Sequence, residues 1–118
     1  MDKNKRLLNK KAVVTGGAQG IGAGIVKRLY NEGVDIIIAD LKKDEAEKLI
    51  NEVDKNKEQI TFFEVDVSNE EKIIELFNFV KNKWDKLDIL INNAGIEDGY
   101  LIQDQTYEKY KKTISINM

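Results

Sequence analysis

The sequence predicts an α/β fold in which a doubly wound parallel sheet is covered by helices on both faces. Short apolar runs alternate with segments whose apolar residues recur at helical spacing, which is typical of strands joined by crossover helices. The runs are continuous rather than alternating, as in strands buried on both faces. A glycine cluster, TGGAQGIG at residues 15–22, separates the first run from the first helical segment. We expect one domain over residues 1–118, with a sheet truncated after about four strands and four helices.

Short runs rich in β-branched and aliphatic residues predict strands at residues 12–14, 34–39, 60–65 and 87–91. The first helix follows the glycines and is expected to stop at Gly33, in a left-handed conformation. The third is expected to begin at a capping box made by Ser68 and Glu71. The apolar faces of the four helices are Ile21, Ile25, Val26 and Leu29; Ala46, Leu49, Ile50 and Val53; Ile73, Leu76, Phe77, Val80 and Trp84; and Tyr107, Tyr110 and Ile114.

The composition excludes several classes of protein and of site. The chain has no cysteine and no histidine, which excludes disulfides, thiolate metal sites and a histidine general base. A net charge of −2 with both signs interspersed is untypical of proteins that bind nucleic acid or an anionic membrane. No apolar run approaches the length of about eighteen residues that a membrane span needs, and no signal peptide is recognisable. We therefore expect a cytoplasmic protein.

The glycine cluster predicts a site for a phosphate group. Helix N-termini present unpaired N–H groups and a partial positive charge, so they attract anions. Gly16 is expected to allow a tight turn, Gly20 a close approach of pyrophosphate to the backbone, and Gly22 close packing of the helix on the strand. The alternative is a flexible turn that binds nothing. Its position between a buried first strand and the first helix favours a dinucleotide.

Asp40 ends the second predicted strand, eighteen residues after Gly22. The dinucleotide-binding pattern expects an acidic residue about twenty residues on, where its carboxylate accepts hydrogen bonds from ribose hydroxyls. The alternative is a cap for the next helix. A carboxylate at this point would repel a 2′-phosphate, and Gln19 offers no charge to attract one. NAD is therefore favoured over NADP, although Lys42 and Lys43 lie close in the sequence.

Four motifs in order resemble the short-chain dehydrogenase/reductase family: TGGAQGIG, AD at residues 39–40, DVS at 66–68 and NNAG at 92–95. The resemblance covers nearly the whole chain. It implies a single-domain Rossmann fold and a nicotinamide-dependent oxidoreductase, which transfers hydride between the nicotinamide and an unknown alcohol or ketone. The other hypothesis is a non-catalytic module for dinucleotide binding or for interaction.

The resemblance also implies the residues of the cofactor site. Two of these assignments have simpler alternatives, since Asp66 could only cap its strand and NNAG could be a plain turn. The implied residues are Gly16, Gln19, Gly20, Ile21 and Gly22 at the pyrophosphate and ribose; Asp40 and Leu41 at the adenosine ribose; Asp66 and Val67 at the adenine; and Asn93, Ala94 and Gly95 beside the adenine-side ribose.

Asn117 in SINM resembles the active-site asparagine of the family, which holds a water in a proton relay; the alternative is a residue on a helix surface. In the family the catalytic serine and a Tyr-x-x-x-Lys pair follow that asparagine, and this sequence has no counterpart there. Tyr107 and Lys111 have the right spacing but precede Asn117, and are expected to be a packing pair on a helix. We expect an N-terminal part of an NAD-dependent dehydrogenase, inactive alone.

Two further expectations concern the last predicted strand. The family usually has a glycine before it, where this chain has Asp85, and aspartate tolerates a left-handed backbone better than most residues. The strand itself, LDILIN, would be an apolar edge of the sheet in this chain, with Asp88 as its only charge. A homo-oligomer formed through that edge is one way to protect it.

Overall fold

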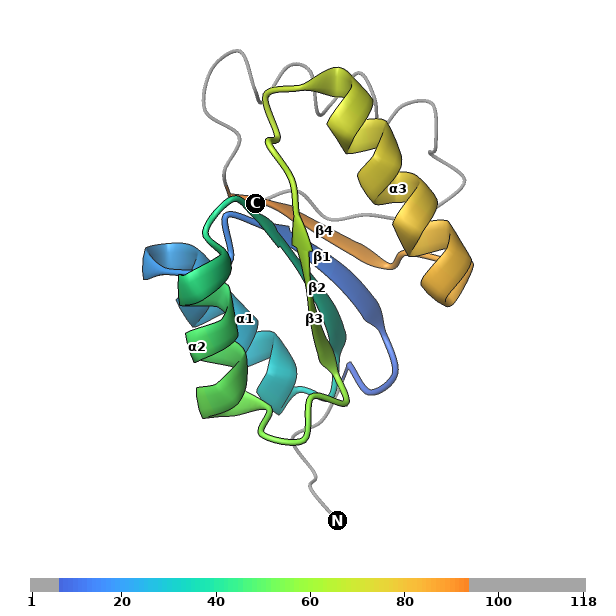
Figure 1. Cartoon of the computed structure of the whole chain (residues 1–118). Helices are drawn as coiled ribbons and strands as arrows, with labels where there is room; N and C mark the ends of the chain where they lie inside the picture. The colour runs from blue at the N-terminus through green and yellow to red at the C-terminus, as the bar shows by residue number, and fades with distance from the viewer. Residues whose placement is uncertain (1–6, 94–118) are drawn as a thin grey trace.

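The computed structural model describes residues 7–93. Four strands form one parallel sheet, as predicted, and three helices alternate with them (Figure 1). The order of the strands in the sheet is β3-β2-β1-β4. Within this range no helix is long and apolar enough to cross a bilayer. The elements are β1 (Lys11–Thr15), α1 (Gly20–Asn31), β2 (Asp35–Asp40), α2 (Lys43–Val53), β3 (Ile60–Glu64), α3 (Glu70–Trp84) and β4 (Ile89–Asn92).

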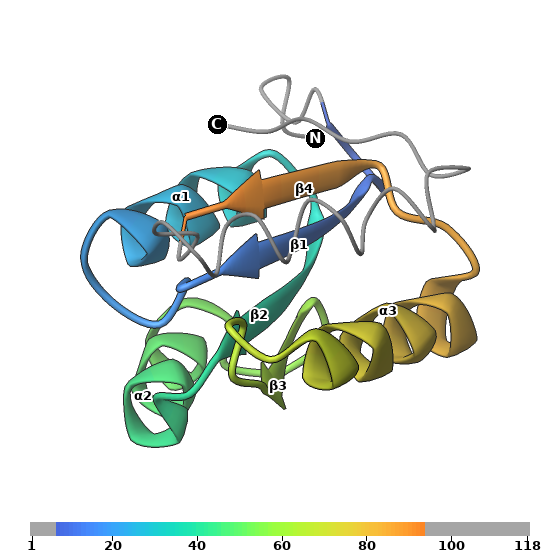
Figure 2. The same ribbon diagram turned by 90° about the horizontal axis from the view of Figure 1, so that it is seen from above.

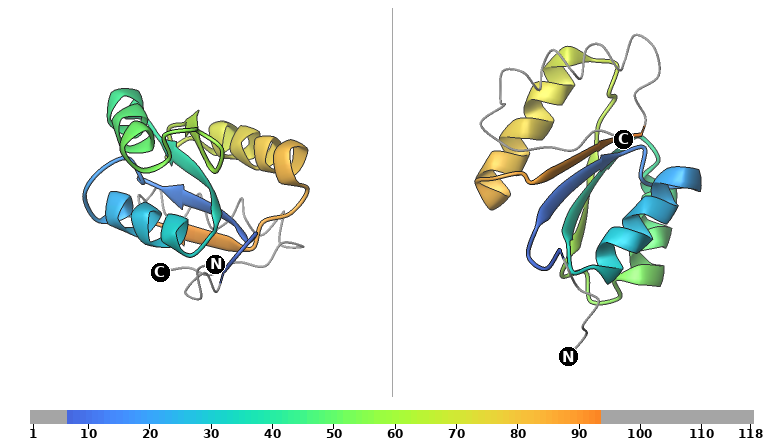
Figure 3. Two further views of the ribbon diagram at one scale, coloured as in Figure 1. Left: turned by 90° about the horizontal axis from the view of Figure 1, so that it is seen from below. Right: turned by 180° about the vertical axis from the view of Figure 1, so that it is seen from behind.

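The helices lie on both faces of the sheet, α1 and α2 on one and α3 on the other (Figures 1 and 3). Successive residues of each strand point to opposite faces, so each strand contributes to two cores. Val14 packs in the core under α1 and α2, whereas Val13 packs under α3. Each buried aliphatic side chain of this size contributes about 1.5–3 kcal/mol. The doubly wound, Rossmann-like architecture follows from these two cores.

The central strand β1 is paired on both sides, and Figure 2 shows the strands side by side. Val13 lies opposite Ile37 of β2 and Leu90 of β4. All four residues of β4 are buried, because its side chains pack beneath helices on both faces. In the part of the chain that the structure describes, β4 pairs only with β1. Its second backbone edge therefore lies at the end of the described sheet.

Observed strand ends differ from the predicted ones by one or two residues. β3 ends one residue early, at Glu64, and β4 begins two residues late, at Ile89, whereas the later carboxyl ends of three strands have one cause. β1, β2 and β4 end on Thr15, Asp40 and Asn92, all later than the apolar runs. A backbone ladder continues through polar residues as long as their N–H and C=O groups meet a neighbour. The prediction from apolar runs missed the polar ends Thr15 and Asn92, whereas Asp40 was predicted as the end of its strand.

The predicted cap of α3 is wrong. Asn69, not Ser68, is the N-cap, and its side-chain oxygen accepts a hydrogen bond from the Lys72 amide at 3.2 Å. The Ser68 hydroxyl instead donates to Asp66 Oδ1 at 2.6 Å. Sequence spacing alone could not choose between the two neighbours, because the competing bond to Asp66 decides which side chain is available.

The two predicted left-handed positions are confirmed. Asp85, which stands where the family usually has glycine, caps α3 with φ of 61°. Gly33 follows α1 with φ of 89°. Both allow the chain to turn back toward the sheet after a helix.

A charged cluster joins the starts of β1, β2 and β4, at the edge opposite the glycine segment. Asp88 Oδ2 accepts hydrogen bonds from the Lys11 amide at 2.9 Å and from the Lys86 ammonium at 3.1 Å. The Lys11 ammonium pairs with Asp35 and lies 5.8 Å from the centre of the Trp84 ring. Partial burial alone would raise the pKa of Asp88, but the hydrogen bonds and nearby lysines outweigh it and hold this pKa below its ordinary value.

Asp88→Asn is therefore expected to flatten the acid side of the stability profile. A carboxyl whose pKa is lowered in the folded state stabilises the fold above its unfolded pKa, about 3.9, and loses this contribution as pH falls through the folded pKa. The free energy of unfolding should differ between parent and variant at pH 7 and converge as the pH falls through the folded pKa of Asp88. Urea denaturation at a series of pH values measures this difference in the free energy of unfolding. Glu47→Gln, a change at an exposed carboxylate, is the control. A difference independent of pH would contradict the assignment.

Candidate functional site

The predicted site residues of the described chain gather at the carboxyl edge of the sheet. Because all strands are parallel, their carboxyl ends lie at one edge. The glycine segment follows β1, Asp40 ends β2, Asp66 follows β3, and Asn93 follows β4. Four segments that are distant in sequence are thus brought to one rim, which is where ligands bind in open α/β sheets.

Gly16 turns the chain at the end of β1 and is held from both neighbouring strands. Its φ of 65° lies in the left-handed region, where a side chain is disfavoured. Its amide donates to the Ala39 carbonyl of β2 at 2.9 Å, and its carbonyl accepts a hydrogen bond from Asn93 Nδ2 at 3.1 Å. The tight turn that the sequence predicted is confirmed, and its two backbone polar groups are both satisfied.

Gly22 allows the start of α1 to lie directly on this turn, as predicted. A Cβ at Gly22 would lie 2.0 Å from the Gly16 carbonyl oxygen and 2.9 Å from Asn93 Nδ2, both too close for any side chain. Gly20, in contrast, faces open space, with no atom within 4 Å of a Cβ built there. Gly22 therefore serves packing, whereas the backbone around Gly20 is accessible from outside.

The N-terminus of α1 differs from those of α2 and α3. Its N-cap, Gln19, makes no side-chain cap bond, and its first turn holds no acidic residue. The first turn of α2 contains Asp44 and Glu45, while α3 is capped by Asn69 and begins with two glutamates. The first N–H groups of a helix have no partner within the helix. Those of α1 are left for an external acceptor, and the helix dipole favours a negative one.

Asp40 ties the end of β2 to the glycine segment. Its Oδ2 accepts a hydrogen bond from the Ala18 amide at 3.1 Å, and its Oδ1 accepts from the amides of Leu41 at 2.6 Å and Lys42 at 3.1 Å. The N-cap of α2 is Lys42, without a side-chain cap bond, so Asp40 is not the helix cap considered as an alternative. Three amide bonds occupy three of the roughly four lone-pair positions of a carboxylate, which leaves Oδ2 able to accept one more.

Asp66 forms a small turn after β3. Its Oδ1 accepts hydrogen bonds from the Ser68 hydroxyl at 2.6 Å and from the Ser68 amide at 3.0 Å. These two bonds hold the pKa of Asp66 below its ordinary value. Val67 is half-buried and packs against the core under α3.

Large apolar side chains are exposed at the same rim. Ile21 in the first turn of α1 is 77% exposed, and Leu41 after β2 is 57% exposed. Gln19 is exposed as well. Water around such aliphatic groups is released when a flat apolar ligand surface covers them.

Three residues of the glycine segment were not assigned a role from sequence. Ala18 supplies the amide that Asp40 binds. Gly17 is buried, and a Cβ there would crowd Val14, Val26 and Ile38 at 3.1–3.3 Å. Thr15 directs its hydroxyl to the Ile91 carbonyl of β4 at 3.3 Å. A threonine directly before glycines was a visible signal, but its partner is 76 residues away in sequence.

Several predicted positions lie outside the described residues: Ala94, Gly95, Asn117, Tyr107, Lys111 and the fourth helix. Residues 7–93 contain no cluster of three acidic side chains that could hold a metal ion. The geometry above therefore concerns the dinucleotide end of the implied site.

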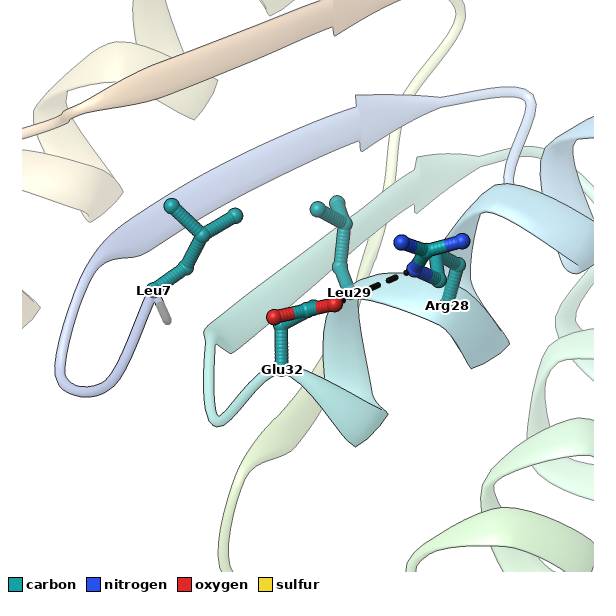
Figure 4. Close-up of a pocket in the computed structure, with 4 residues that line it drawn as sticks. All are labelled: Leu7, Arg28, Leu29 and Glu32. Carbon is teal, nitrogen blue, oxygen red and sulfur yellow. Dashed lines mark hydrogen bonds and ion pairs between the residues drawn. The ribbon is translucent and has the colours of Figure 1, made fainter. Parts of the chain in front are cut away.

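A hollow of about 430 Å³ lies elsewhere, at the C-terminal end of α1 (Figure 4). It is lined by Leu7, Leu29 and the ion pair in which Arg28 Nε donates to Glu32 Oε2 at 3.2 Å. Because the glycine segment lies at the opposite end of α1, this hollow is separate from the candidate site.

Known proteins share the sequence and the fold of this chain. The family model described as short chain dehydrogenase matches residues 10–118. The chain belongs to this family. Short-chain dehydrogenases bind a nicotinamide dinucleotide.

Curated relatives of this short-chain dehydrogenase chain are longer than it is. The uncharacterized oxidoreductase YxbG of Bacillus subtilis is 34% identical over 114 residues, which are 96% of this chain and 42% of the relative. The 3-oxoacyl-acyl-carrier-protein reductase FabG of Chlamydia pneumoniae is 34% identical over 112 residues, 95% of this chain and 45% of that protein. The chain spans less than half the length of these relatives.

Solved structures share the fold. A short chain dehydrogenase from Mycobacterium smegmatis superimposes with a TM-score of 0.83 at 21% identity, over 99% of this chain and 60% of that one. The crystal structure of gox2181 gives a TM-score of 0.80 at 24% identity, over 98% of this chain and 55% of that one.

Proposed function

We propose that the chain binds NAD at the carboxyl edge of its sheet, as the dinucleotide-binding part of a short-chain dehydrogenase that transfers hydride between NAD and an alcohol or ketone. One observation carries the proposal. The only helix of the described residues that lacks both a side-chain cap and an acidic first turn is α1, and it begins directly after the pinned glycine turn. A diphosphate satisfies the free amides and the positive end of the dipole.

The remaining contacts divide among the parts of the cofactor. Asp40 Oδ2 accepts a hydroxyl of the adenosine ribose with its remaining lone pair. The exposed side chain of Leu41 covers one face of the adenine, and Asp66 with Val67 lies at its edge. Ile21 and Gln19 border the diphosphate and the second ribose. By the resemblance, the backbone of Asn93, Ala94 and Gly95 would run beside the adenine-side ribose.

The preference for NAD over NADP follows from charge. A 2′-phosphate would stand beside the Asp40 carboxylate, which three backbone amides hold in place. Juxtaposed like charges cost several kcal/mol in a binding site. Lys42 and Lys43 are exposed next to this point and would attract the phosphate once the carboxylate charge is removed.

The nicotinamide, when bound, supplies the hydride acceptor or donor. By the resemblance, Asn117 holds a water of the proton relay, which passes a proton to or from the substrate oxygen. The resemblance also implies a serine and a Tyr-x-x-x-Lys pair after Asn117, and this sequence contains none there. We therefore expect the 118 residues alone to bind the cofactor weakly and to show no turnover.

Asp40→Asn tests the ribose assignment. The parent chain is expected to bind NAD at least about tenfold more tightly than NADP, and the variant to lose most of that ratio, because the carboxylate charge is gone. Calorimetric titration with NAD and with NADP measures both affinities. Asp44→Asn, an exposed aspartate in the first turn of α2, is the matched control and should keep the parent ratio.

Two results would contradict the proposal. A variant that keeps the parent ratio of NAD to NADP affinity would show that Asp40 does not face the ribose. A folded parent chain that binds neither dinucleotide would overturn the proposed function as a whole.

A further inference from the structure

We propose that Asn93 is a positioning residue for the diphosphate site: its side-chain amide holds the Gly16 carbonyl and thereby sets the orientation of the glycine turn and of the first turn of α1. This inference rests on the proposed function, because it concerns the same ligand. Asn93 acts through Gly16 in this assignment, and its side chain need not touch the cofactor.

Hydrogen bonds from both neighbouring strands hold the glycine turn in place. β1 lies between β2 and β4, so the turn that leaves β1 can be held from two sides. From the β2 side, the Ala39 carbonyl binds the Gly16 amide and the Asp40 carboxylate binds the Ala18 amide. From the β4 side, Asn93 Nδ2 binds the Gly16 carbonyl at 3.1 Å. Losing the Asn93 bond leaves the turn held from one side.

The peptide group that Asn93 holds can rotate more freely than most. The peptide group between Gly16 and Gly17 has no Cβ on either side, so its rotation meets little steric resistance. In a trans peptide the C=O and the following N–H point in opposite directions. A hydrogen bond to the Gly16 carbonyl therefore also sets the direction of the Gly17 N–H.

The Gly16 carbonyl also contacts α1, the helix whose N-terminus receives the anion. A Cβ on Gly22 would lie 2.0 Å from the Gly16 oxygen, so the first turn of α1 packs directly on that atom. Movement of the carbonyl must then shift the first turn, whose amides the diphosphate binds. A carbonyl oxygen that turned toward the diphosphate would also repel it, since both carry negative charge.

Asn93→Ala is expected to weaken ADP binding about tenfold and to leave adenosine binding within about twofold, because only the phosphate-binding amides lose their orientation. NMR titration of the isotope-labelled 118-residue chain measures both affinities. The same spectra, without ligand, should show the Gly17 and Gly22 amide signals shifted. Asn82→Ala, the same change at an exposed position of α3, is the control and should alter neither affinity nor these signals.

Asn93→Asp provides a second variant of the same shape. At neutral pH its carboxylate cannot donate to the Gly16 carbonyl and repels it, so ADP affinity should fall at least as far as in Asn93→Ala. Circular dichroism establishes that each variant is folded. Equal losses of adenosine and ADP affinity, or parent affinity for ADP in the aspartate variant, would overturn the positioning role. A folded parent chain that binds neither ligand would instead overturn the proposed function.

Discussion

Gly22→Ala is expected to abolish measurable dinucleotide binding and to lower the free energy of unfolding by about 3 kcal/mol. The new Cβ would stand 2.0 Å from the Gly16 carbonyl oxygen, a backbone atom held by Asn93. Because this oxygen belongs to the backbone and not to a flexible side chain, α1 must move away from the turn. Urea denaturation and titration with NAD measure the two effects.

Gly24→Ala is the matched control for this prediction. Gly24 lies two residues further along α1, is exposed, and has no atom within 4 Å of a Cβ built there. Alanine stabilises a helix interior by about 0.5–1 kcal/mol relative to glycine, so this variant should be more stable than the parent and bind NAD equally well. If both alanine variants bound and unfolded alike, the close approach of α1 to the turn would be refuted.

Asp54→Ala is expected to lower the free energy of unfolding by about 3 kcal/mol. Asp54 is 2% exposed at the end of α2, and its Oδ2 accepts hydrogen bonds from the amides of Gln59 at 2.7 Å and Ile60 at 2.8 Å. These bonds close the loop that leads into β3. Alanine would leave two amides without an acceptor, one of them buried, and urea denaturation measures the loss.

Asp54→Asn tests whether lost hydrogen bonds or lost packing destabilise the Asp54→Ala variant. Both amides bind the same Asp54 oxygen, so the single carbonyl oxygen of Asp54→Asn can still accept them, and the loss should be about 1 kcal/mol. Glu58→Ala removes an exposed carboxylate from the same loop and should have little effect. An asparagine variant as unstable as the alanine variant would argue against the two hydrogen bonds as the cause.

The fold was largely predictable because its signals are local. Each buried strand is a continuous apolar run, and the lengths between them allow only helical crossovers. Asp85 is one example: it stands where the family usually has a glycine, and aspartate tolerates a left-handed backbone, so a left-handed residue was predicted there. Its φ of 61° confirms this. The cap of α3 could not be predicted from local sequence, because Ser68 and Asn69 are both good N-caps. The hydrogen bond from Ser68 to Asp66 leaves Asn69 as the cap.

The candidate site was predictable in its members and much less in its connections. The glycine spacing and Asp40 were recognisable because a strand, a turn and a helix follow one another directly in sequence. The bond from Asn93 to Gly16 spans 77 residues, and no spacing rule predicts it. Asn93 was expected beside the ribose, and its hydrogen bond to the turn became visible only in three dimensions.

The sequence by itself determined the alternation of strands and helices, the place of the glycine turn and the family. These properties depend on hydrophobic periodicity and on backbone conformations that favour glycine. Both can be recognised from residues that are close together in the sequence. The tertiary structure decided which polar groups meet: Asp40 with Ala18, Asn93 with Gly16, and the start of α1 with the turn beneath it. Hydrogen bonds require partners within about 3 Å, and only the pairing of β2 and β4 with β1 brings these segments that close.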